Sequence, residues 1–194
     1  MKTPFFKLFV VALLITFTSC KKEVKLSEYK FAEKGIVLNC DKFDLKLLNE
    51  ALFSFENDII NFYSKDEKNV SRAYGQFVRN AVNNRLNYKN VASQHTLEIF
   101  EVLKTKTNLW NLNNTVSKFN YNNPVFNCIK QNIQNKDLKT TLNALTTTNS
   151  MSPKLFGASL SKGFVYAEKD KYLAAYIAFD LFYAKFFDIE FSKK

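Results

Sequence analysis

Side chains that could hold a metal come together in one segment of the chain. His95 is the single histidine, Glu98 lies one helical turn later, and Glu101 falls near the same face of a predicted helix. A metal needs several convergent ligands, usually with more than one histidine or cysteine among them. Nothing else in the sequence adds ligands to this group, so we predict no metal site and an exposed polar helix face.

A serine and a lysine one helical turn apart form a second candidate. Ser159 and Lys162 have the Ser-x-x-Lys spacing, which resembles the nucleophile and lysine of the penicillin-binding enzymes and implies acyl transfer. The Ser-x-Asn and Lys-Thr-Gly motifs of those enzymes do not follow, and 194 residues is short for their fold. We therefore predict no catalytic residue.

Three cysteines divide into one near the N-terminus and two in the body of the chain. Cys40 precedes a predicted helix, and Cys128 lies inside another. In an oxidising compartment two such cysteines can form a disulfide, and in the alternative both remain buried thiols. Their spacing fits no metal motif.

The first 20 residues have the anatomy of an export signal. Lys2 and Lys7 form a basic start, and the apolar run 8–17 is too short for a normal membrane span. The sequence Phe-Thr-Ser-Cys at 17–20 then resembles the lipobox of bacterial lipoproteins, with Phe in place of the usual Leu.

This resemblance implies a lipid anchor. Residues 1–19 would be removed as a signal peptide, and Cys20 would carry diacylglycerol on its sulfur and an acyl group on its new amino group. Two or more acyl chains anchor a protein stably to a bilayer. Lys21 stands where an aspartate often marks inner-membrane retention, so the resemblance points to the outer membrane and leaves the face open. We expect residues 20–34 to carry the lipid and act as a tether, and residues 35–194 to form one domain.

The composition favours a helical protein with a substantial core. Hydrophobic residues make up 46% of the chain, whereas Gly and Pro number only 4 and 3, which favours long helices over short strands. A charge of +10 could serve nucleic acid, anionic lipid or an acidic glycan, but the lysines are spread along the whole chain. Export argues against nucleic acid. We find no glycine-rich phosphate loop, calcium loop or Walker-type motif, so we predict no cofactor.

The apolar run at residues 172–187 is expected to be the centre of the fold. It is too long for one strand, rich in alanine, and interrupted only by Asp180 and Lys185. A helix that is apolar on all sides is surrounded by other helices, and the two charges argue against a membrane span. For Asp180 we expect a solvent-facing edge or a pairing with a lysine, with a buried functional carboxylate as the alternative. Four residues on different faces are predicted to be buried: Ala175, Ile177, Phe179 and Phe182.

Helical periodicity recurs in the rest of the chain. The expected helices cover roughly 44–64, 71–86, 93–104, 124–133, 137–145 and a segment from 152 that Gly157 and Gly163 interrupt. Ser71 and Ser93 can cap the second and third of these helices. The first has a core-facing stripe of apolar residues at alternating spacings of four and three: Leu45, Leu48, Leu52, Phe55, Ile59 and Phe62. Together with the central run these helices predict an all-α, single-domain bundle of about six or seven helices. The irregular segment 107–123 holds Trp110, which we expect to pin the segment to the core, with ligand stacking as the alternative.

The sequence indicates where the protein acts more clearly than what it does. We expect a non-catalytic binding or scaffolding protein of the bacterial envelope, held to the bilayer through acylated Cys20. Its partner would be an envelope protein or an anionic glycan. One alternative is an inhibitor or immunity-type protein, which exposed aromatic clusters would favour. The other is an envelope hydrolase, which a deep pocket with converging polar groups would favour.

Overall fold

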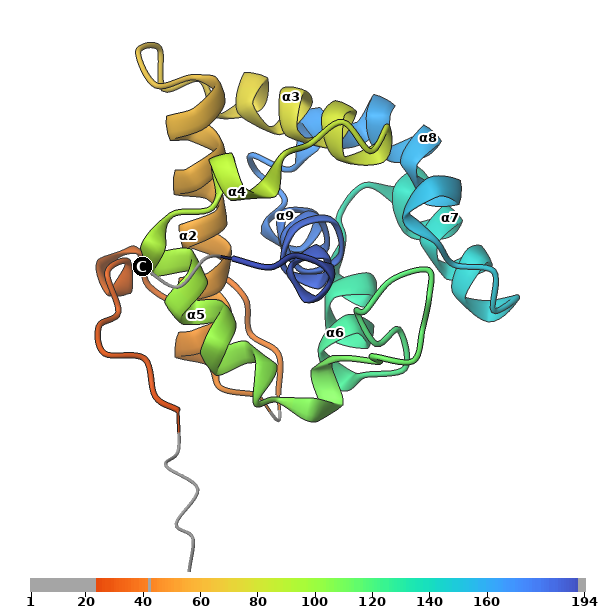
Figure 1. Cartoon of the computed structure of the whole chain (residues 1–194). Helices are drawn as coiled ribbons and strands as arrows, with labels where there is room; N and C mark the ends of the chain where they lie inside the picture. Colours follow the sequence, from red (N-terminus) through yellow and green to blue (C-terminus); the bar gives the residue numbers. More distant parts are fainter. Residues whose placement is uncertain (1–23, 42, 192–194) are drawn as a thin grey trace, which may run out of the picture.

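A computed structural model describes residues 24–41 and 43–191, which fold into one compact all-α unit, as predicted (Figure 1). This part of the chain contains eight α-helices and no strand, one helix more than the upper expectation. Helix α4 has only 4 residues, too few to show a helical period. The helices are α2 (Leu45–Tyr63), α3 (Val70–Val82), α4 (Tyr88–Val91), α5 (Gln94–Lys104), α6 (Pro124–Asn132), α7 (Lys136–Thr147), α8 (Pro153–Gly163) and α9 (Lys171–Tyr176).

The C-terminal run is the centre of the fold, but it is not one regular helix. After α9 the chain continues as a π-helical segment, Ile177–Phe182, and then as a 3-10 segment, Tyr183–Asp188. Figure 1 shows this blue segment nearly end-on, with the other helices arranged around it. The four residues predicted to be buried have no exposed surface: Ala175, Ile177, Phe179 and Phe182.

Polar side chains cap the N-terminal ends of several helices. Asp44 accepts from the Leu47 amide at the start of α2, and Ser93 caps α5 as predicted. Helix α3 begins at Val70, one residue before the expected start, because Asn69 rather than Ser71 caps it. Pro124 occupies the first turn of α6, where its missing N–H costs no hydrogen bond.

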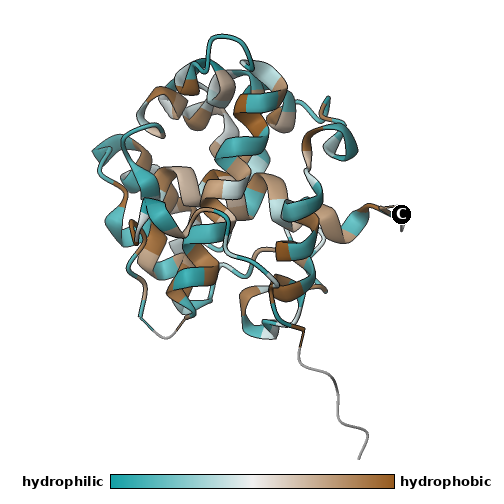
Figure 2. Cartoon of the chain, turned by 90° about the vertical axis from the view of Figure 1, so that its left-hand side faces the viewer, coloured by the Kyte–Doolittle hydropathy of each residue, from teal (hydrophilic) through white to brown (hydrophobic). Residues whose placement is uncertain are grey.

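Most outer helices bury one face and expose the other, but α2 is buried on every side over residues 47–56. In α2 the predicted stripe is buried at Leu48, Leu52 and Ile59, whereas Phe62 at the last turn is 47% exposed. Figure 2 shows hydrophilic and hydrophobic residues alternating around such helices. Burial of these apolar faces against the central segment is the main source of stability in a fold of this kind.

Helix α8 runs through Gly157, which corrects the expected interruption there, and ends at Gly163, where the 3-10 segment Phe164–Tyr166 follows. Both glycines face close neighbours. A Cβ added at Gly157 would come within 2.6 Å of Val82 in α3, and one at Gly163 within 2.6 Å of Leu138 in α7. The glycines therefore allow close helix packing.

The expected tether lies only partly within the described residues. Its described part, 24–34, reaches the domain at α2, where the Lys30 and Phe31 amides donate to the Glu50 carboxylate. Contact with the domain thus begins before Gly35. The signal peptide and Cys20 lie outside the described residues. No helix within 24–41 and 43–191 is both long and apolar enough to cross a bilayer.

A disulfide joins Cys40 to Cys128, with Cα atoms 5.7 Å apart, so the pairing alternative is confirmed. Cys40 belongs to the segment before α2, and Cys128 lies in α6. On the Cys40 side, the Asn49 side chain accepts from the backbone amides of Val37 and Leu38. The disulfide therefore links the α2 side of the molecule to α6.

Candidate functional site

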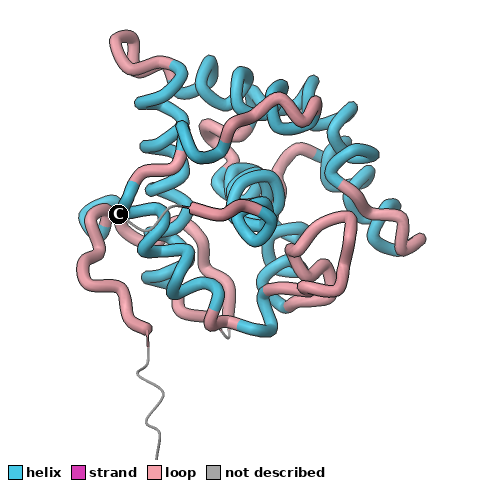
Figure 3. The backbone as a smooth tube through the Cα atoms, in the orientation of Figure 1, coloured by secondary structure: helices cyan, strands magenta, loops and turns pink. Residues whose placement is uncertain are grey.

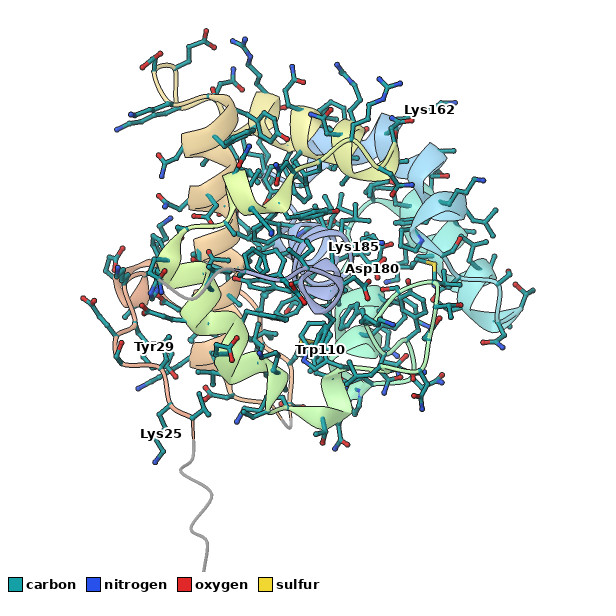
Figure 4. All side chains as sticks on the ribbon, in the orientation of Figure 1. Lys25, Tyr29, Trp110, Lys162, Asp180 and Lys185 are labelled. Carbon is teal, nitrogen blue, oxygen red and sulfur yellow. A yellow bond between two sulfur atoms is a disulfide. The ribbon has the colours of Figure 1, made fainter. Side chains whose placement is uncertain are left out.

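A fully buried carboxylate lies at the centre of the molecule. Asp180 has no exposed surface, and Figure 4 shows it in the middle of the fold. Its Oδ1 accepts from the Ser117 hydroxyl at 2.5 Å and the Tyr121 hydroxyl at 3.0 Å. Its Oδ2 accepts from the Tyr176 hydroxyl at 2.6 Å. The expected solvent-facing edge is therefore wrong, because three hydroxyls replace water around this carboxylate.

Lysine does not provide the expected local pairing either. Within the described chain, no ion pair joins Asp180 to Lys185, although the lysine's charge lowers the pKa of the carboxyl. Burial is the larger effect and raises that pKa, while the hydrogen bonds from the three hydroxyls lower it. Burial and the neighbouring Asp180 charge raise the pKa of the Tyr121 and Tyr176 phenols, which keeps both as hydrogen-bond donors.

The backbone around Asp180 is also unusual. The residue lies within the π-helical segment, a rare conformation that often occurs at functional sites. Tyr176, the last residue of α9, directly precedes this segment, and its hydroxyl reaches Asp180 four residues later. Helix geometry thus supplies one hydroxyl, and a distant loop supplies the other two.

That loop joins α5 to α6 (Figure 3). Its buried residue Trp110 holds it against the core. The indole is only 6% exposed, its Nε1 donates to the Leu103 carbonyl at 2.8 Å, and its ring lies 5.1 Å from that of Phe187. Trp110 also forms an isolated antiparallel bridge with Phe119, which folds the loop back on itself. The expected core role of Trp110 is confirmed, and its burial leaves no ring face for stacking on a ligand.

The same loop forms one wall of a polar pocket with a volume of about 350 Å³. Helix α6, the end of α7 and the loop between α7 and α8 contribute the remaining lining, which includes Lys130, Thr146 and Met151. Tyr121 lines this pocket as well, so a single side chain lies between the pocket and the Asp180 carboxylate. We call it the asparagine pocket after six of its lining residues: Asn111, Asn114, Asn120, Asn122, Asn127 and Asn149.

Most of these amides have no partner within the described chain. Asn114 accepts from the Val116 amide, and Asn120 bonds backbone groups of the same loop. The other four side chains make no hydrogen bond to the rest of the described chain. A carboxamide offers both donors and an acceptor, as a sugar hydroxyl does. The pocket is therefore suited to a ligand rich in hydroxyl groups.

A second buried carboxylate lies between α2 and α5. Glu50 is 2% exposed and accepts from the Lys30 amide at 2.6 Å, from the Phe31 amide at 3.1 Å and from His95 Nε2 at 2.6 Å. This contact corrects the prediction that His95 lies on an exposed helix face, since only 6% of its surface is exposed. We call Glu50, His95 and the two amides the Glu50 centre.

The candidate metal ligands do not converge. Glu98 and Glu101 are exposed on α5, and Glu101 pairs with Lys104 instead. Across residues 24–41 and 43–191, no three His, Cys, Asp or Glu side chains come close enough to hold a metal. The remaining His95 nitrogen, Nδ1, is buried and has no hydrogen-bond partner in the described chain.

Two further acidic residues of α2 form hydrogen bonds and an ion pair with neighbouring helices. Glu56 accepts from the Tyr74 hydroxyl at 2.8 Å and pairs with Lys171 at 2.6 Å. Asp58 accepts from the Thr96 hydroxyl at 2.6 Å and from the Ser93 amide, and its burial raises its pKa. The hydrophobic stripe did not predict these buried charges, which tie α2 to α3, α5 and α9.

The Ser-x-x-Lys motif shows no catalytic geometry. Ser159 and Lys162 lie on α8 and make no hydrogen bond to each other in the described chain. Figure 4 shows Lys162 extending outward, away from Asp180. Among residues 24–41 and 43–191, no general base contacts the Ser159 hydroxyl, as an activated nucleophile would require.

Comparison of the chain with protein-family models, curated proteins and solved structures gave no match. The site therefore has to be argued from its own geometry. Sequence reasoning missed Ser117, Tyr121 and Tyr176. Of these three residues, only Tyr176 could have been found from the sequence, because it lies four residues before a carboxylate in an otherwise apolar predicted helix.

Proposed function

We propose that this chain is a lipid-anchored protein of the bacterial envelope that binds a hydroxyl-rich ligand, a glycan, without chemical conversion. The asparagine pocket is the observation that carries the proposal. Its unpaired amides would exchange hydrogen bonds with water for hydrogen bonds with sugar hydroxyls. Asparagines are otherwise ordinary surface residues, but here loop, α6 and α7 bring six of them to one cavity.

The buried position of Asp180 supports binding rather than hydrolysis. Glycoside hydrolysis uses two carboxyl groups that reach the scissile bond from opposite sides. The asparagine pocket has no acidic residue in its lining, and Asp180 is shielded from it by Tyr121 and engaged by three hydroxyls. In this proposal Asp180 fixes the position of Tyr121 and does not contact the ligand.

The envelope location is supported by the lipobox-like residues 17–20 and by the disulfide between Cys40 and Cys128. Disulfides persist in oxidising compartments outside the cytoplasm. Cys20→Ala should abolish acylation and move the protein out of the detergent phase on phase separation. Mass spectrometry of the mature wild-type protein should find lipid on Cys20; a chain without lipid would overturn the anchor.

Glycan binding is tested with the detergent-solubilised mature protein on an array of envelope oligosaccharides. The protein should be retained, and the double variant Asn122→Ala/Asn127→Ala should lose roughly tenfold or more in affinity, about one net hydrogen bond per residue. Asn61→Ala/Asn90→Ala, which removes two exposed asparagines outside the pocket, is the matched control. Equal binding by both double variants would refute the assignment of the pocket.

A further inference from the structure

A second pocket adjoins the asparagine pocket and carries more positive charge, with two lysines in its lining where the asparagine pocket has Lys130 alone. Its volume is about 280 Å³, and its lining includes Asn83, Asn84, Ser152, Lys154 and Lys185. We call it the lysine pocket. It contains no acidic lining residue, so its two ammonium groups are the only formal charges at its surface.

The two pockets share part of their walls. Val116, which is 46% exposed, lines both of them. Met151 lines the asparagine pocket, and the next two residues, Ser152 and Pro153, line the lysine pocket. The loop before α8 and the loop between α5 and α6 therefore carry a ligand surface that continues from one pocket to the other.

The lysines of this pocket are not used for structural ion pairs. Lys118 lies 3.9 Å from Asp188 and Lys171 lies 2.6 Å from Glu56, whereas neither Lys154 nor Lys185 has a carboxylate partner within 4 Å in the described chain. Lys185 is also half-buried, in the 3-10 segment that follows Asp180. Its charge acts on the buried Asp180 carboxyl without forming an ion pair, so the ammonium remains open to an anion in the pocket. A partly buried charge is also screened less by salt than a fully hydrated one is.

We propose that the two pockets together bind an acidic sugar chain, with hydroxyl groups in the asparagine pocket and a carboxylate or sulfate in the lysine pocket. This inference rests on the proposed function and specifies its ligand. Lysine suits such a site because its compact charge accepts an anion without a fixed planar geometry.

The test uses an array on which each uronic-acid or sulfated oligosaccharide is printed beside its carboxyl-reduced or desulfated counterpart. The wild-type mature protein should retain the acidic form roughly tenfold more strongly than the neutral form. Lys154→Gln/Lys185→Gln should abolish this difference and leave binding of the neutral form unchanged. Lys136→Gln/Lys162→Gln removes the same charge from exposed positions outside both pockets and should bind as the wild type does.

The outcomes separate the two proposals. Equal retention of acidic and neutral forms, or equal losses in both double variants, would overturn the acidic ligand and leave glycan binding in place. Retention of neither form would contradict both. Loss of binding to both forms in Lys154→Gln/Lys185→Gln, with an unchanged melting temperature, would also contradict the division of roles between the pockets.

Discussion

The Glu50 centre and Asp180 are both buried carboxylates, yet their surroundings differ. Glu50 accepts from two backbone amides and an imidazole, all fixed by the fold, and its contacts join the start of the domain to α2 and α5. Asp180 accepts only from hydroxyls, and one of them belongs to Tyr121, which lines the asparagine pocket. A change at Glu50 should therefore affect stability alone, whereas a change at Asp180 should affect stability and binding together.

The disulfide links the segment before α2, the helix that carries Glu50, to α6, which lines the asparagine pocket, and its loss should have the largest effect. Cys40→Ser/Cys128→Ser should lower the free energy of unfolding by about 4–5 kcal/mol, because the bond closes a loop with a sequence separation of 88. Urea denaturation measures the loss. Labelling the native wild-type protein without reductant should find neither thiol, and two free thiols would contradict the bond.

The central segment carries Asp180 and also packs against α2, the helix of Glu50. Truncating a buried side chain of this segment should have the next largest effect. Phe182 is fully buried, with its ring 5.1 Å from Phe55 and 4.6 Å from Phe186. Phe182→Ala should cost about 3–5 kcal/mol, as for large buried aromatic residues. Phe62→Ala, at a ring that is 47% exposed, should cost less than about 1 kcal/mol. If Phe182→Ala melted within a degree or two of the wild type, the segment could not be the core.

Matched substitutions in the two regions sharpen the comparison. Glu50→Gln keeps the shape but weakens three hydrogen bonds, and should cost about 1–3 kcal/mol without changing glycan affinity. Tyr121→Phe removes a hydroxyl from Asp180 and should cost about 1 kcal/mol and also weaken binding. Calorimetric unfolding and glycan titration on both variants give the comparison. A binding defect confined to Glu50→Gln would reverse the assignment.

The smallest expected effect is a pH dependence at Asp180. Because burial raises its pKa in the folded state, the folded protein binds this proton more tightly than the unfolded chain does. The resulting stabilisation is present below the carboxyl's ordinary pKa and is lost as pH rises through the raised value. In urea denaturation from pH 3 to pH 7, stability of the wild type should fall relative to that of Asp180→Asn. A relative rise would show that the hydroxyls outweigh burial.

Periodicity and capping were enough to predict most of the fold. The stripe of α2, the Ser93 cap and the apolar run around Phe182 each follow from local chemistry that the sequence displays directly. The π-helical segment was not predictable in this way, because it depends on how the surrounding helices pack against the C-terminal run.

The candidate site was harder to predict than the fold. Asparagines that are scattered in the sequence become one pocket only after the loop folds back at Trp110 and α6 packs beside it. The sequence favours a solvent-facing edge or a lysine pairing for Asp180, because a buried charge is costly unless it is paired. Its actual partners Ser117 and Tyr121 lie about sixty residues away. Such long-range pairings leave no local pattern.

The most direct test of the account is to observe the pocket asparagines while a ligand binds. In the mature protein labelled with ¹⁵N, the side-chain amide signals of Asn111, Asn122, Asn127 and Asn149 can be assigned by single substitution and followed during titration with an array-selected acidic oligosaccharide. If the asparagine pocket binds the glycan, these four signals should shift saturably while those of Asn61 and Asn90 stay unchanged. Saturable shifts at Asn61 and Asn90, with none among the four pocket asparagines, would contradict binding in the pocket.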